Sequence, residues 1–108
     1  MSNKDILKKL IQHTQKVITY CAGKSFEEFV EDTMCIEACV FNISQIGELS
    51  HRLEIEFVKE HTEIAWNQLY GLRNRIVHDY EGVNLHLIWE IVNEDIPELI
   101  ELLKRIEE

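Results

Sequence analysis

The chain has little of what breaks up regular secondary structure. Its 108 residues include one proline and four glycines, so we expect long elements joined by short connections. The sequence also lacks strand-like alternation of apolar and polar residues, and no segment is repeated. The length suffices for one hydrophobic core and is too short for two. We therefore predict a single all-α domain over residues 1–108.

Long apolar runs and basic residues are scarce as well. No run approaches the roughly 18 residues of a membrane-spanning helix, and the polar residues 1–5 do not resemble a signal peptide. We therefore expect no membrane association. Only 11 Lys and Arg stand against 20 Asp and Glu, and the formal net charge is −9. This charge argues against broad, nonspecific binding of nucleic acid, so any such site must be a small basic pocket on an acidic body.

The three cysteines, Cys21, Cys35 and Cys39, are an odd number without a paired framework. Each lies in a helical, partly apolar context, which fits reduced thiols in a cytoplasmic protein. Cys35 and Cys39 are four residues apart and could share a helix face. No histidine or further cysteine lies near them at ligand spacing. We therefore expect small buried side chains at these positions, no metal site and no cofactor.

Helical periodicity predicts four main helices and one short extra helix. The main helices should cover about residues 4–22, 25–53 with a bend near 31–33, 64–79 and 85–106, and the short one residues 55–58. A capping box of the S-x-x-E form, Ser25 with Glu28, begins the second. Pro97 removes an amide donor inside the last helix, so we expect a kink or break near residues 93–95. The simplest arrangement is an antiparallel bundle.

The segment 71–80 gathers two arginines, an asparagine, a histidine and a tyrosine. On a helical wheel Arg73 falls inside the apolar arc, where an unpaired charge costs roughly several kcal/mol. Arg73 must therefore be paired or bind a ligand, and Glu48 in the preceding long helix is a candidate partner. Asn74 and His78 lie about 40° apart on a polar stripe beside the arc. This stripe is the first place to look for chemistry.

These side chains could cleave RNA without a metal ion. Such a site needs a group that moves a proton at the ribose 2′-oxygen near neutral pH, and a cation that stabilises charge on the phosphate. His78 suits the first task, and Arg73 or Arg75 the second. Arg73 and His78 are about 140° apart on one helix, so they would converge in a cleft or across a two-fold axis. A purely structural interpretation is the alternative, with His78 hydrogen-bonded in the interior and Arg73 in an internal ion pair.

The run from Arg73 to Tyr80 resembles the R-x-x-x-x-H-x-Y motif of the HEPN superfamily, in particular its HepT-like toxins. The resemblance implies an all-helical HEPN bundle that acts as a homodimer, with both copies of the motif lining one cleft. It further implies a metal-independent ribonuclease with the 2′-hydroxyl as nucleophile. Arg73 and His78 would then be catalytic, while Asn74 and Arg75 would support them or bind RNA phosphate. Further segments that resemble the family pattern are residues 46–48, 64–66, 87–90 and 95–99.

HepT-like toxins are usually encoded beside an MntA-type nucleotidyltransferase antitoxin, so the resemblance implies such a partner and transfer of AMP to Tyr80. AMP would place a bulky anion at the edge of a cationic cleft, where it would compete for the arginines and repel RNA. The competing hypothesis is a noncatalytic HEPN module that binds a nucleotidyltransferase or nucleotides. The net charge of −9 favours this hypothesis, as does Glu81, which stands where the family commonly has an aromatic residue.

Overall fold

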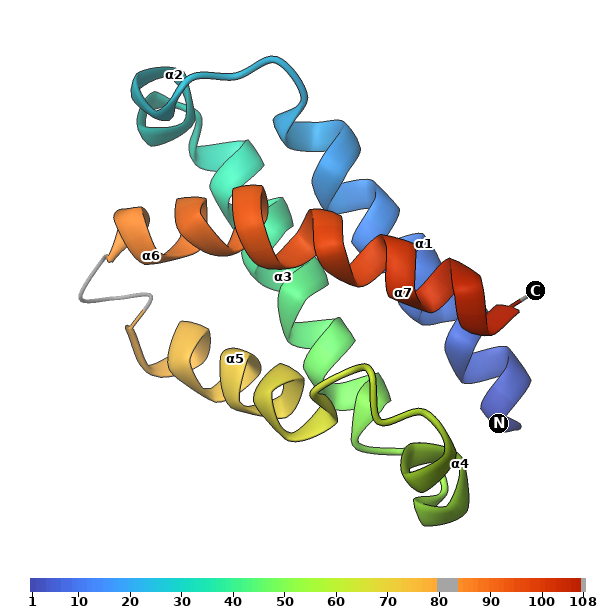
Figure 1. Cartoon of the computed structure of the whole chain (residues 1–108). Coiled ribbons are helices and arrows are strands. Elements are labelled where there is room, and N and C mark those ends of the chain that lie inside the picture. The colour runs from blue at the N-terminus through green and yellow to red at the C-terminus, as the bar shows by residue number, and fades with distance from the viewer. Residues whose placement is uncertain (80–83, 108) are drawn as a thin grey trace.

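In the computed structural model the chain folds into an antiparallel helical bundle. The structure describes the backbone of residues 1–79 and 84–107 and the side chains of residues 1–76 and 84–107. These residues contain no strand, which confirms the all-α prediction. The elements in chain order are α1 (Asn3–Cys21), α2 (Phe26–Glu31), α3 (Thr33–Ser50), α4 (Ile55–Glu60), α5 (Trp66–Asp79), α6 (Leu85–Glu90), the π-helical segment η1 (Ile91–Asp95) and α7 (Ile96–Glu107) (Figure 1).

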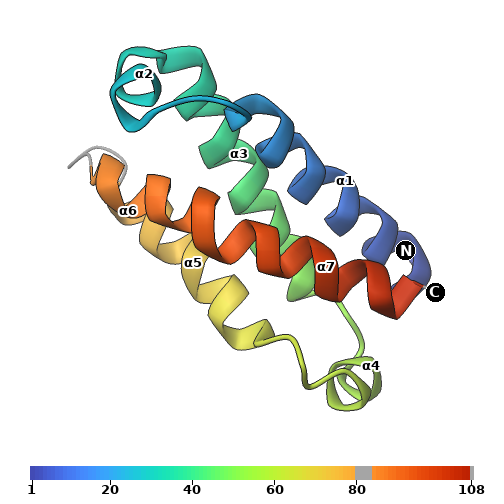
Figure 2. The ribbon, with the colours of Figure 1, turned by 45° about the horizontal axis from the view of Figure 1, so that its top comes forward.

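The long helix α3 lies at the centre of the bundle. It packs against α1 on one side and against α5 on the other, and α7 packs along α1. Figure 2 shows the short helices α2 and α4 at opposite ends of the molecule. A helix in contact with neighbours on two sides must present apolar residues over much of its surface. This position accounts for the buried apolar residues of α3, among them Ile36, Ile43 and Leu49.

Residues 25–53 were predicted to form one bent helix, but in the structure they form two helices, α2 and α3. Asp32 has φ −103° and ψ 84°, outside the helical region, and its side chain accepts a hydrogen bond of 3.0 Å from the backbone N–H of Cys35. Asp32 therefore ends α2 and caps α3, because an aspartate side chain satisfies an amide that lacks a helical partner. The predicted capping box of Ser25 and Glu28 begins α2. The structure therefore has two short helices between the long ones, α2 and α4. Only the second, predicted at residues 55–58, was expected.

The last helix continues past Pro97 without a break. Pro97 has no N–H to donate to the carbonyl four residues earlier. Just before it, the N–H of Ile96 donates to the carbonyl of Ile91, five residues back, which is the π-helical pattern of η1. The predicted disturbance near residues 93–95 is therefore present as a π-helical turn between α6 and α7.

Buried side chains from α1, α2, α3, α5, α6 and α7 form one core. Fully buried members include Leu10, Val17, Phe29, Ile43, Ile76 and Leu103. Removing apolar surface from water at about 25 cal/mol per Å² is the main favourable term that holds such a bundle together. Among the described residues, none of the helices is both long enough and apolar enough to cross a bilayer.

Candidate functional site

A glycine sets the distance between α3 and α5. Gly47 on α3 is buried, and a Cβ placed on it would overlap the Cβ of Arg73 and lie 3.0 Å from the carbonyl oxygen of Leu69. The missing side chain lets the two helices approach more closely than any other residue would permit. This close crossing holds the base of the Arg73 side chain directly against α3.

Two neighbours orient the guanidinium of Arg73. Its Nε lies 2.9 Å from Oε1 of Glu48, the residue after Gly47, and its Nη1 donates to Oδ1 of Asn74 at 2.8 Å. Among the described side chains only these two bind the guanidinium, so Nη2 retains donors for another acceptor. An arginine held in this way can offer its outer edge to a phosphate oxygen.

The Arg73–Glu48 pair lies at the surface of the bundle. The side chains of Arg73 and Glu48 are 33% and 37% exposed, whereas the helical wheel placed Arg73 inside the apolar arc. The glycine explains the difference, because the stem of Arg73 covers Gly47 while its charged end reaches the solvent. The pair therefore contributes little to stability, about 0–1 kcal/mol, and its main consequence is the orientation of the guanidinium.

Arg75 lies on a different face of α5 from Arg73. The two residues are about 200° apart around the helix, and Arg75 lines a cavity of about 560 Å³ between α5 and α7. Asp95 is exposed at the rim of this cavity. Partial desolvation, and then the charges of Glu90 and Glu98, raise its pKa, while Arg75 opposes the shift. The structure therefore does not bring Arg75 together with Arg73. The acidic side chains that line the cavity are Glu63, Glu90, Asp95 and Glu98.

The other predicted site residues follow Arg73 at the end of α5. The backbone of His78 belongs to the last turn of α5, one turn beyond Asn74, but its side chain lies outside the described side chains. Tyr80 and Glu81 lie outside the described residues altogether. The convergence of Arg73 with His78, and the role of Tyr80, therefore stay predictions.

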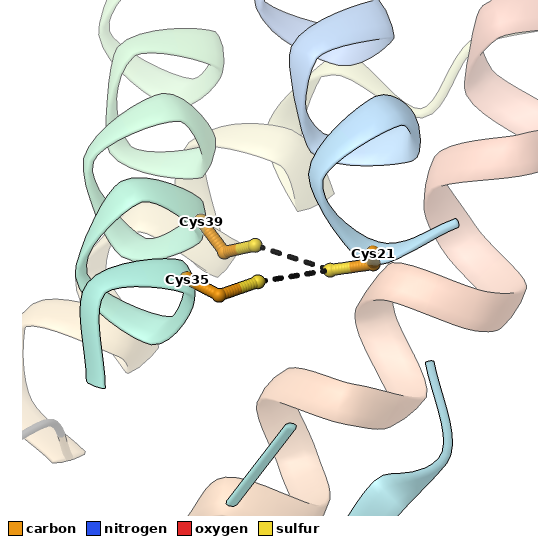
Figure 3. A group of neighbouring side chains, drawn as sticks. All are labelled: Cys21, Cys35 and Cys39. Carbon is orange, nitrogen blue, oxygen red and sulfur yellow. Dashed lines mark hydrogen bonds between the residues drawn. The ribbon is translucent and has the colours of Figure 1, made fainter. Parts of the chain in front are cut away.

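A second group of reactive side chains lies between α1 and α3. The sulfur of Cys21, the last residue of α1, is 3.3 Å from the sulfur of Cys39 and 3.8 Å from that of Cys35 (Figure 3). Sequence spacing related Cys35 to Cys39 but did not connect either with Cys21. The signal was topological, because Cys21 ends one helix and Cys35 begins its antiparallel neighbour.

Comparison with known proteins gives one consistent family. The family model described as "Ribonuclease HepT-like" matches residues 10–106. "Putative RNase TTE0752" of Caldanaerobacter subterraneus subsp. tengcongensis is 36% identical over 100 residues, which cover 93% of this chain and 89% of the relative. "Probable ribonuclease HepT" of Thermococcus cleftensis is 31% identical over 98 residues, 91% of this chain and 89% of the relative.

A further relative has a similar length. "Putative RNase MJ0127" of Methanocaldococcus jannaschii is 29% identical over 114 aligned positions, which cover 99% of this chain and 94% of the relative. No solved structure matches the chain. The family model spans most of the sequence, and two of the relatives exceed 30% identity over nearly their full length. The chain therefore belongs to the HepT-like family of the HEPN superfamily.

Proposed function

We propose that the protein is a metal-independent ribonuclease of the toxin type. The observation that carries this proposal is the guanidinium of Arg73, which Glu48 and Asn74 orient while its Nη2 edge keeps donors for a phosphate. The ribonuclease names of the relatives support the same class of activity. RNA is the substrate in this proposal because its 2′-hydroxyl supplies the nucleophile.

Each motif residue has a distinct task in the proposed reaction. His78 removes the proton of the 2′-hydroxyl, the 2′-oxygen bonds to phosphorus, and the bond from phosphorus to the 5′-oxygen breaks. The leaving oxygen takes a proton from the His78 imidazolium of the second copy. Arg73 stabilises the extra negative charge on the phosphate, and Asn74 supports it by accepting a hydrogen bond from its Nη1. Arg75, which sequence reasoning placed beside them, faces the acidic cavity on another side of α5 and has no part in this step. Glu48 holds Nε of Arg73 and Asn74 holds Nη1, which leaves Nη2 for the substrate.

The proposal includes a homodimer formed through the outer face of α3. Met34 and Phe41 on this helix are 82% and 59% exposed, although both are large and apolar. Residues 34, 41 and 48 recur every seven positions, so Glu48 lies on the same face. A second copy packed along this face would bury Met34 and Phe41 and bring two Arg73–Glu48 pairs toward one two-fold axis.

Regulation by a partner enzyme forms part of the same proposal. An MntA-type nucleotidyltransferase would transfer AMP to Tyr80 in the cytoplasm, and the place of Tyr80 in the motif supports this step. AMP at this end of α5 would bring a negative charge toward the arginine and compete with RNA. A mass increase of one or more AMP units on Tyr80, seen after incubation with the partner and ATP, is the expected signature.

A noncatalytic HEPN module is the second candidate function. The acidic cavity beside Arg75 favours it, because several carboxylates there repel an RNA backbone. In this case the chain would bind a nucleotidyltransferase or a nucleotide without cutting RNA.

The deciding experiment is RNA cleavage by the purified protein in the presence of a metal chelator. Arg73→Ala and His78→Ala should each lower the rate by about 100-fold or more, the usual effect of removing a group that stabilises or moves charge in the transition state. Arg105→Ala removes an exposed arginine from the last turn of α7 and is the matched control. Intact RNA with the wild-type protein, together with tight binding to the partner, would support the noncatalytic module instead.

A further inference from the structure

Three buried cysteines from two helices meet at the junction of α1 and α3. Cys21, Cys35 and Cys39 are 8%, 7% and 0% exposed, and their sulfur atoms all lie within 4.8 Å of one another. Figure 3 shows the side chains of Cys35 and Cys39 extending from α3 toward Cys21. Cys39, the cysteine of the cluster nearest to Glu48 along α3, lies nine residues before it, or about 14 Å along the helix. The cluster is therefore separate from the proposed ribonuclease site.

The spacing of the sulfur atoms suits a metal ion better than a disulfide. An ion with metal–sulfur bonds of about 2.3 Å holds its thiolates about 3.8–4.0 Å apart. The sulfur of Cys21 already lies 3.3 Å from that of Cys39 and 3.8 Å from that of Cys35. A disulfide would require one pair to close to about 2.05 Å and would leave the third thiol unused. Binding an ion needs the smaller displacement and uses all three sulfur atoms.

Of the three thiols, that of Cys21 loses its proton most easily, and a thiolate is the form that binds a cation. Thiol hydrogen bonds, first from Cys39, lower the pKa of Cys21 to about 7, and the charge of Lys24 acts in the same direction. Burial raises the pKa of Cys35 to about 11, and the bond to Cys21 and burial raise the pKa of Cys39. An ion must therefore displace the protons of Cys35 and Cys39. The first turn of α3, which contains Cys35, adds positive potential that favours thiolates.

We propose that Cys21, Cys35 and Cys39 bind one thiophilic ion, Cu(I), through three thiolates. Soft sulfur ligands select soft ions, and among the described residues this cluster includes no histidine or carboxylate as a fourth ligand. Three-coordinate Cu(I) needs no further ligand, whereas Zn(II) prefers four. The ion would join the end of α1 to the beginning of α3 and stabilise the folded state by binding to it.

The test is an anaerobic titration of the fully reduced protein with Cu(I) against a chromophoric Cu(I) chelator. We expect one Cu(I) per chain, a thiolate-to-copper absorption band in the ultraviolet, and a higher unfolding temperature. Cys21→Ser, Cys35→Ser and Cys39→Ser should each weaken binding by at least about 100-fold, because the loss of even an outer partner of a ligand costs about 10–100-fold. Affinity should fall as the pH is lowered from 8 to 6, because protons compete for the sulfurs.

Met34→Leu is the matched control, because it removes an exposed sulfur next to Cys35 and leaves all three thiols in place. Its Cu(I) affinity should equal that of the wild type. Alkylation with mass spectrometry gives a second measurement on the wild-type chain, in which bound Cu(I) should protect all three thiols together. Three results would each overturn the proposal. The chelator keeps its copper, one of the Cys→Ser variants binds Cu(I) as tightly as the wild type, or the protein prefers Zn(II) to Cu(I).

Discussion

Gly47→Ala is the substitution that most directly tests how the crossing of α3 and α5 positions Arg73. The added methyl group would overlap the Cβ of Arg73 and press on the Leu69 carbonyl, so the helices must separate by about 1 Å to restore ordinary contact. Overpacking of this kind costs about 1–3 kcal/mol. Against this cost, alanine stabilises the helix by about 1 kcal/mol relative to glycine, because it has the higher helix propensity. The free energy of unfolding should therefore fall by about 0–2 kcal/mol.

The effect on cleavage should be larger than the effect on stability. A displacement of about 1 Å in a catalytic group lowers a rate by about 100-fold, and Arg73 moves with the backbone of α5. Gly71→Ala is the matched control on the same helix, because its new Cβ would meet nothing within 4 Å. That variant should gain about 0.5–1 kcal/mol of stability, since glycine disfavours a helix interior.

Urea unfolding followed by circular dichroism gives the stabilities, and cleavage of RNA by the folded proteins gives the rates. In the first assay Gly47→Ala should lower the stability and Gly71→Ala should raise it, and in the second Gly47→Ala should lower the rate. A Gly47→Ala protein as stable as Gly71→Ala would show that α3 and α5 are not in close contact. Full activity with the expected loss of stability would show that the crossing does not position a catalytic Arg73.

Three further predictions concern charge and assembly. Glu48→Ala should lower kcat/KM for RNA about tenfold, or about 1.4 kcal/mol of transition-state stabilisation, with little change in the unfolding midpoint, while Glu48→Gln keeps an acceptor for Arg73 and should lose less. Asp95→Asn should stabilise the fold slightly at pH 7, because partial desolvation and the charges of Glu90 and Glu98 raise the folded pKa of Asp95 and its ionised form therefore destabilises the fold. Asp95 is exposed, so the gain should be small, and it should vanish when unfolding is measured below about pH 3.8, the ordinary pKa. Phe41→Glu should convert the proposed dimer into monomers in analytical ultracentrifugation, and an unchanged sedimentation coefficient would exclude the α3 face as the interface.

Much of the fold was predictable because the bundle obeys local rules. The capping box at Ser25 and the apolar periodicity gave the main helices within a few residues of their observed ends. The break at Asp32 was harder to predict, because a bent helix and two helices have almost the same periodicity. Asp32 could have been recognised as a cap, since aspartate often occupies that position. The position of the helix disturbance before Pro97 was predictable, but whether it would be a kink or a π-helical turn was not. Both leave the same helical hydrogen bond unmade.

The site was less predictable, because it depends on distances between helices. Sequence reasoning named Glu48 as a candidate partner for Arg73, and the structure places them 2.9 Å apart. Nothing in the sequence showed that Gly47 would let α5 approach so closely, since a glycine inside a helix has several explanations. The cysteine cluster was missed for the same reason. Cys21 meets Cys39 only because α1 and α3 are antiparallel neighbours.

The two arginines of the motif define the side from which RNA would approach. Arg75 lines a cavity between α5 and α7 that also contains several carboxylates. These carboxylates, on a chain with a net charge of −9, would repel an RNA phosphate from that side. Arg73 lies on the α3 side, beside the exposed face that contains Phe41. In the proposed function a single copy would offer the guanidinium of Arg73 to a phosphate, whereas two copies related by a two-fold axis would offer two such groups. A dimer through α3 would therefore supply the local positive charge that the acidic chain lacks.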